Sequence, residues 1–196
     1  MADRISILVV NGSVRPRNYT AKASALVVDE FRKDPQVSVE VIDPATIDLP
    51  FPGTRPGAEA TVLLQKKVSA AAGIVLATPE YHGSFSSVMK LVIENLGFPS
   101  VLSGKPVALL GVAAGAIGAI KSLEQLRSVC AHVGAIALPL PVSVANVQKV
   151  FDADGRCLDP AVEKLIRSVA TNLTNYMQRH VCPAIQLERI LREGVA

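Results

Sequence analysis

Residues 73–85 read Gly73-Ile74-Val75-Leu76-Ala77-Thr78-Pro79-Glu80-Tyr81-His82-Gly83-Ser84-Phe85. The first five residues form an apolar run that is typical of a strand buried on both faces of a parallel sheet. An apolar pattern of helical spacing follows from Phe85 to Leu96, so Thr78–Phe85 is predicted to be the turn between a strand and a helix. In open α/β sheets this edge is where ligands bind. The stretch therefore predicts both the class of fold and the place of a site.

The same alternation of strand and helix patterns runs along the chain. Strands are predicted at Ile5–Val10, Val37–Ile42, Gly73–Ala77, Pro106–Gly111 and Ala135–Leu138. Helices are predicted at Tyr19–Lys33, Ala58–Ala72, Phe85–Leu96 and Ile117–Val133, with a last helix beginning at Asp159-Pro160 and a loop at Asp43–Gly57. Such alternation favours right-handed crossovers and a parallel sheet. We expect one α/β domain over residues 1–196, with the doubly wound strand order 2-1-3-4-5 and a ligand site between strands 1 and 3.

Composition narrows the class of protein. The chain has 196 residues, 49% of them hydrophobic, which allows a sizeable core and argues against disorder. No apolar stretch approaches the ~20 residues of a membrane span, and the N-terminus lacks a signal-peptide pattern. The three cysteines are far apart, which disfavours a disulfide framework or zinc site. A net charge of +3 is too small to indicate nucleic-acid binding. We expect a cytoplasmic protein with no metal ligands and no membrane or nucleic-acid partner.

The turn after the first strand, Asn11–Thr20, has the composition of a phosphate site. It leads into a helix N-terminus, where free N–H groups and the helix dipole favour an anion. Ser13, Asn18 and Thr20 add short hydrogen-bonding side chains, and Arg15 adds a positive charge. The turn contains neither G-x-G-x-x-G nor the P-loop motif, so neither of those nucleotide-binding folds is indicated. The alternative is that Asn18 or Thr20 only caps the helix.

The other two turns are less specific by themselves. Tyr81 would most often belong to a core, and His82 to a surface. The whole turn, however, offers several backbone amides beside an aromatic ring, as the polar edge of a flavin or another planar heterocycle requires. The small residues of Val112–Gly118 would allow either a ligand or a packed helix to come close, and the pattern does not choose between them.

With these turns the chain resembles the NADPH-dependent FMN reductase family, which has a flavodoxin-like three-layer fold and includes quinone, azo-dye and chromate reductases. The resemblance covers about residues 5–180. It rests on Gly12-Ser13-Val14-Arg15 with Asn18-Tyr19-Thr20, on Pro79–Phe85 with Lys90, and on Gly115 and Gly118 with Leu126-Arg127. The second group is the most specific, since the family usually reads P-E-Y-N-G-S there. In this chain His82 stands in place of the asparagine.

The resemblance implies FMN as cofactor and NADPH or NADH as co-substrate. The residues implied to hold the FMN phosphate are Ser13, Arg15, Asn18, Tyr19 and Thr20. Those implied to border the flavin ring are Pro79, Glu80, Tyr81, His82 and Gly83, with Gly115 beside it from the third turn. Arg15 is also a candidate for the 2′-phosphate of NADPH. The family further implies a homodimer or homotetramer. Candidate interface residues are Phe85, Val88, Met89, Val92 and Ile93, with the loop Leu49–Pro52.

The expected activity is transfer of hydride from NAD(P)H through FMN to a small-molecule acceptor, which would be a flavin, quinone, azo compound or metal oxyanion. A ping-pong mechanism follows from this, in which oxidised nicotinamide leaves before the acceptor binds. Because the flavin carries the chemistry, we expect no catalytic side chain. The absence of G-x-S-x-G argues against a hydrolase of that type. Two alternatives stay open: a non-enzymatic electron carrier of flavodoxin type, and a regulatory protein that binds a flavin.

Overall fold

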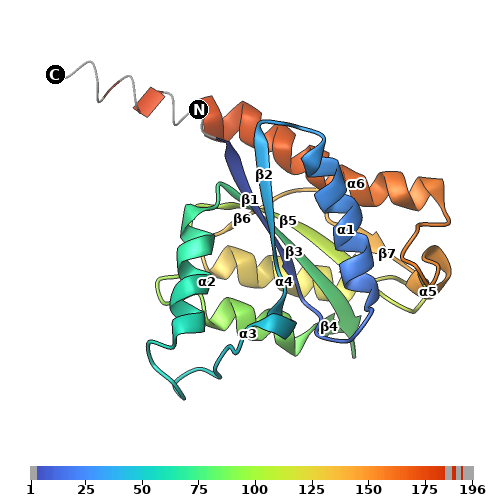
Figure 1. Ribbon diagram of the computed structural model, residues 1–196, viewed down its shortest axis with the longest axis horizontal. Coiled ribbons are helices and arrows are strands. Elements are labelled where there is room, and N and C mark those ends of the chain that lie inside the picture. Colours follow the sequence, from blue (N-terminus) through green and yellow to red (C-terminus); the bar gives the residue numbers. More distant parts are fainter. Residues whose placement is uncertain (1–3, 184–186, 189–190, 192–196) are drawn as a thin grey trace.

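A parallel sheet with helices on both faces forms the centre of the computed structural model, which describes residues 4–183, 187, 188 and 191 (Figure 1). The main strands are β1 (Ile5–Asn11), β2 (Val37–Ile42), β3 (Gly73–Tyr81), β5 (Pro106–Val112) and β6 (Ile136–Ala137). They are hydrogen-bonded in the order β2-β1-β3-β5-β6, and each neighbouring pair is parallel. Because β4 is only a short hairpin strand, this is the predicted order 2-1-3-4-5 of the main strands. The flavodoxin-like topology is confirmed.

Two hydrophobic cores lie on opposite faces of the sheet. One packs under α1 (Tyr19–Arg32) and α6 (Pro160–Tyr176) and the other under α2 (Glu59–Ala70), α3 (Ser87–Glu94) and α4 (Ile120–His132). Within β1 the side chains alternate between the cores, since Ile7 and Val9 join the first and Leu8 and Val10 the second. All four are at most 2% exposed, which explains the unbroken apolar pattern of the strand. Shorter helical segments are Pro44–Thr46, α5 (Val147–Val150) and Met177–Val181.

Several elements near the ligand edge begin or end differently from prediction. Strand β3 runs on to Tyr81 instead of ending at Ala77, and it pairs there with the antiparallel strand β4 (Ser84–Phe85). Helix α3 begins at Ser87, because Ser86 Oγ accepts a hydrogen bond from Met89 N (3.0 Å) and caps the helix. Helix α4 begins only at Ile120, because Gly118 has a φ of +78° that a helix cannot contain.

The fifth strand, predicted at Ala135–Leu138, is only two residues long as β6. A second short strand that was not predicted, β7 (Val142–Val144), also pairs with β5. Pro139 and Pro141 lie between them and have no N–H to donate to a ladder, and Leu140 has a φ of +62°. The edge of the sheet is therefore too short and irregular to pair easily with the edge of another molecule.

The described residues show no disulfide, metal cluster or membrane-spanning helix. Cys130, Cys157 and Cys182 are all free thiols. Among the described residues, no group of three histidine, cysteine, aspartate or glutamate side chains is arranged to hold a metal ion. In the same part of the chain, no helix combines the length and the apolar character needed to cross a membrane.

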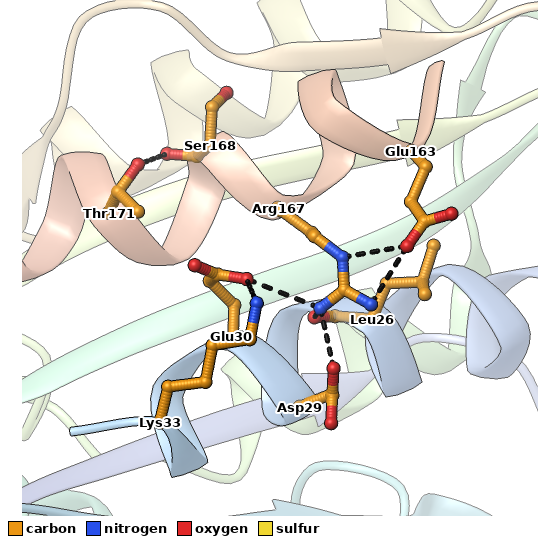
Figure 2. A network of polar contacts seen from close by, with 8 residues as sticks. All are labelled: Leu26, Asp29, Glu30, Lys33, Glu163, Arg167, Ser168 and Thr171. Atoms are coloured by element: carbon orange, nitrogen blue, oxygen red, sulfur yellow. Dashed lines mark hydrogen bonds and ion pairs between the residues drawn. The ribbon is translucent and has the colours of Figure 1, made fainter. Parts of the chain in front are cut away.

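Helices α1 and α6 are joined by an ion-pair network around Arg167 (Figure 2). Its Nη1 donates to Asp29 Oδ2 (2.6 Å) and Glu30 Oε2 (3.2 Å), and its Nε donates to Glu163 Oε1 (2.9 Å). Lys33 Nζ also contacts Glu30 Oε2 (2.5 Å). The hydrogen bond from Arg167 holds the pKa of Asp29 below its usual value, and the hydrogen bond from Lys33 does the same for the pKa of Glu30.

Arg167→Met is expected to destabilise the protein by about 1–2 kcal/mol near neutral pH, since the hydrogen bonds to charged partners are lost from a half-buried position. The two depressed carboxylate pKa values add stability above their unfolded values, and that stability is lost as the pH falls through the folded values. The variant should therefore lose less stability than the wild type between pH 5 and acid denaturation. Urea unfolding at several pH values measures this. Arg55→Met, which removes an exposed pair with Asp48, is the control that should change nothing measurable.

Candidate cofactor-binding site

A cavity of about 620 Å³ opens at the carboxyl ends of β1, β3 and β5. Its volume lies within the ~300–1,000 Å³ usual for small-molecule sites, and its place is the switch point between β1 and β3. Eight of the eleven predicted residues line it: Ser13, Arg15, Asn18, Tyr19, Thr20, Pro79, Glu80 and Tyr81. The other lining residues are Pro16, Arg17, Val112, Ala113, Ala114, Val147 and Gln148. The remaining predicted residues, His82, Gly83 and Gly115, belong to the adjoining turns and are not among those that line it.

Asn18 shapes the first turn and caps α1. Its Oδ1 accepts a hydrogen bond from Ala21 N (2.7 Å), and its Nδ2 donates to Arg15 O (2.8 Å). The capping interpretation is thus correct for Asn18, but the same side chain also folds the loop that forms one wall of the cavity. The first turn of α1 contains no acidic residue. Its first N–H groups, which have no partner within the helix, therefore favour an anion at this end of the cavity.

Ser13 lies at this end of the cavity and is only 2% exposed. Its Oγ has no hydrogen-bond partner among the described residues. A buried hydroxyl without a partner costs about 1–3 kcal/mol, and a ligand in the cavity that accepts its hydrogen bond would offset that cost. The hydroxyl and the neighbouring helix N-terminus are together suited to a phosphate group.

Gly12 and Ser86 connect the first turn to the end of β3. Gly12 N donates to Ala77 O (2.7 Å), and Ser86 Oγ donates to Gly12 O (2.5 Å). Ser86 N in turn donates to Thr78 Oγ1 (3.1 Å). Ser86 and Thr78 are both buried, so the two turns are held together by a bridge that excludes water. The sequence interpretation missed this bridge, although Ser86 stands just before an apolar helical pattern, where a cap is expected.

The second turn is a tight hairpin. Glu80 and Tyr81 pair with Phe85 and Ser84, which leaves His82 and Gly83 as a two-residue loop. Their φ values of +51° and +75° fit a type I′ turn, in which both central residues are left-handed. Tyr81 remains 38% exposed, and Arg15 Cζ lies 5.4 Å from the centroid of its ring. This cation–π contact spans the mouth of the cavity between the first and second turns.

The left-handed conformation explains why position 82 suits asparagine and tolerates histidine, since both enter this region more readily than most residues. His82→Asn is expected to leave stability unchanged or raise it by about 0.5 kcal/mol, because Asn-Gly is the preferred pair for this turn. His82→Val should destabilise the protein by about 1–2 kcal/mol, because a β-branched side chain is strained there. Thermal unfolding of both variants measures the difference. Equal stability of the two variants would argue against the left-handed turn.

The side chain of Glu80 caps the N-terminus of α4. Its Oε2 accepts a hydrogen bond from Ser122 N (3.0 Å), and Ala119, the residue at the N-cap of this helix, makes no side-chain cap. A carboxylate at this place also complements the helix dipole. The side chain of Glu80 thus has a structural role that the sequence interpretation did not foresee.

The third turn is tied to α5. Ala113 O accepts from Val147 N (3.0 Å), and Gly115 O accepts from Asn146 N (3.1 Å). These bonds bring Val147 and Gln148 to the cavity, whose wall here is formed by the small residues Val112–Ala114. Sequence reasoning missed Gln148, because a four-residue helix has no detectable periodicity.

The charges around the cavity favour an anionic ligand. Lys22 Nζ is directed away, to Asp152 O (2.6 Å), and lies 5.0 Å from the centroid of the Tyr19 ring. Arg15 and Arg17 remain as cations that line the cavity, and the carboxylate that lines it, Glu80, is bound to α4. The balance is therefore positive.

Comparison with known proteins identifies the family. The profile of the NADPH-dependent FMN reductases matches residues 5–149. The NAD(P)H-dependent FMN reductase of Pseudomonas aeruginosa is 30% identical over 187 residues, which cover 91% of this chain and 98% of that protein. An NADPH azoreductase of Bacillus sp. is 28% identical over 177 residues, which cover 89% and 96%. The solved flavoenzyme NAD(P)H:(acceptor) oxidoreductase of Paracoccus denitrificans has the same fold, with a TM-score of 0.74, 20% identity and coverage of 89% and 98%.

These matches confirm the predicted family, and with it FMN as the cofactor and oxidoreduction as the class of reaction. The family match extends over all three turns of the cavity edge, from the first strand to α5. The relatives are matched over nearly their full length, so the likeness is not confined to one motif. The chain therefore belongs to the NADPH-dependent FMN reductase family.

Proposed function

We propose that FMN binds in the 620 Å³ cavity, with its phosphate at the N-terminus of α1 and its ring toward the hairpin turn. The residues proposed to hold the phosphate are Ser13, Arg15, Asn18, Tyr19 and Thr20. Those proposed to border the ring are Pro79, Glu80, Tyr81, His82 and Gly83, with Gly115 and its neighbours on the third turn. The observation that carries this assignment is the buried Ser13 hydroxyl, which has no partner within the described residues.

The proposed reaction is the NAD(P)H-dependent reduction of a quinone, azo compound, flavin or metal oxyanion. When bound, FMN supplies a group that accepts a hydride and passes on its electrons. The chain then has to bind, orient and partly shield the reactants, and the Arg15–Tyr81 contact at the mouth is suited to this. Because a single mouth would serve both substrates, we propose a ping-pong order in which oxidised nicotinamide leaves before the acceptor enters. The azoreductase relative supports azo compounds as one class of acceptor.

The test is a spectrum and a turnover assay on the purified protein. We expect a flavin spectrum, FMN on mass analysis of the heat-released chromophore, and NADPH oxidation with menadione or FMN as acceptor. Parallel lines in double-reciprocal plots would support the ping-pong order. A yellow protein without turnover would favour a flavodoxin-type carrier or a flavin-binding regulatory protein, and a colourless protein that takes up no FMN would contradict the assignment of the cavity.

We also propose that two copies associate through the face formed by α3 and α4. Most of the predicted interface stripe is not free for this, because Met89, Val92 and Ile93 are buried in the chain's own core and Phe85 packs against it. Phe98, however, is 100% exposed and borders a groove of about 490 Å³ between these helices. Lys90 and Glu94 form an ion pair on the same rim, and a two-fold axis that passes between them would also place Lys90 of each copy near Glu94 of the other.

Phe98→Asp is expected to convert a dimer to monomers at micromolar concentration, since an aromatic anchor at the centre of an interface commonly contributes ~2 kcal/mol or more. Sedimentation velocity measures the change. Leu165→Asp, on α6 at the opposite face, is the control and should leave the dimer intact. A wild-type monomer, or a dimer that survives Phe98→Asp, would rule out this interface.

A further inference from the structure

Helix α4 holds the tip of the β3–β4 hairpin through Gln125. Its Nε2 donates to Gly83 O (3.0 Å), and its Oε1 accepts from Ser84 Oγ (2.6 Å). Together with the bond from Ser122 N to Glu80 Oε2, three hydrogen bonds connect α4 to three hairpin residues, Glu80, Gly83 and Ser84. Gln125 itself is not among the residues that line the cavity.

The hairpin needs this support. It contains only two residue pairs, Glu80 with Phe85 and Tyr81 with Ser84, and its loop has two left-handed residues of which only one is glycine. A two-stranded hairpin of this length is not stable by itself in water. The strand side of the turn carries Tyr81 into the cavity wall, so the position of Tyr81 depends on how firmly the tip is held.

We propose that Gln125 is a positioning residue for the nicotinamide substrate: by fixing Gly83 and Ser84 to α4, it keeps Tyr81 at the mouth of the cavity. This rests on the proposed function, because it assigns the mouth to NAD(P)H. The buried bridge of Ser86 and Thr78 holds the phosphate end independently of Gln125. Loss of Gln125 should therefore weaken the binding of NADPH at the mouth much more than that of FMN, whose phosphate end stays in place.

The test is Gln125→Met, a substitution of similar length that can make neither hydrogen bond. We expect KM for NADPH to rise about 5-fold and kcat and the Kd for FMN to change by less than about 2-fold, as for the loss of two exposed hydrogen bonds. Ser84→Ala removes one of the two bonds and should have a smaller effect. The double variant should be no worse than Gln125→Met alone, since both changes break the same contact. Glu124→Gln, on the same helix, is the control and should match the wild type.

Hydrogen–deuterium exchange supplies a readout that does not depend on turnover. Backbone amides of residues 80–86 should exchange at least several-fold faster in Gln125→Met than in the wild type, with FMN bound. Two results would overturn the proposal: unchanged exchange at the hairpin, or a Kd for FMN that rises as much as KM. A lower melting temperature with unchanged KM would reduce Gln125 to a structural role. If the wild type itself fails to oxidise NADPH, the proposed function fails, while the exchange result still tests whether Gln125 fixes the hairpin tip to α4.

Discussion

Gly12→Ala is expected to destabilise the protein by about 3 kcal/mol and to abolish its retention of FMN during purification. A Cβ at this position would lie 2.7 Å from Ala77 O and 3.1 Å from Met89 Cε. Ala77 O is a backbone atom that already accepts a hydrogen bond from Gly12 N, so it cannot move without separating β1 from β3. Overpacking of a tight core costs about 1–3 kcal/mol, and here the displaced atoms also carry the bridge from Ser86 to Gly12.

Urea unfolding of the FMN-free protein measures the stability, and quenching of FMN fluorescence measures the affinity. Gly115→Ala is the matched control for stability, because no atom lies within 4 Å of a Cβ built there and its φ is not left-handed. It should change the free energy of unfolding by less than about 0.5 kcal/mol. If Gly12→Ala unfolds at the same urea concentration as the wild type, the close approach of the two strands at this point is wrong.

The contrast between these glycines shows what the sequence could and could not predict. The alternation of apolar strands with helices along the sequence was sufficient to predict the strand order. Burial on both faces leaves a continuous apolar run in β1, β3 and β5, which makes these strands easy to find. Gly12 and Gly115 look alike in a sequence. Only the distance to Ala77 O shows that one is constrained by packing and the other is not.

The candidate site was predicted best where short motifs carry it. The turn Ser13–Thr20 follows β1 and the segment Pro79–Tyr81 ends β3, and both reach the cavity, as expected for the carboxyl ends of these strands. The contribution of Gln148 could not be predicted, because it depends on long-range backbone bonds from Ala113 and Gly115 to the start of α5. The roles of Glu80 and Gln125 were hidden for the same reason, since their partners lie about 40 residues away in the chain.

Ser13→Ala is expected to change stability and FMN affinity in opposite directions. The hydroxyl is buried and has no partner within the described residues, so its removal should stabilise the FMN-free protein by about 1 kcal/mol. The same hydroxyl is proposed to donate to the FMN phosphate, and a hydrogen bond to a charged group contributes about 1.5–3 kcal/mol. The Kd for FMN should therefore rise about 10–100-fold.

Two controls, riboflavin binding and Ser24→Ala, test whether the effect of Ser13→Ala is specific to the FMN phosphate. Riboflavin has no phosphate, so its affinity should be the same for Ser13→Ala and the wild type. Ser24→Ala is the matched control, because Ser24 Oγ is likewise buried in α1 without a partner among the described residues but does not line the cavity. It should stabilise the FMN-free protein and leave FMN affinity unchanged. A parallel loss of FMN and riboflavin affinity in Ser13→Ala would place the phosphate elsewhere, because the hydroxyl would then act on the part that both ligands share.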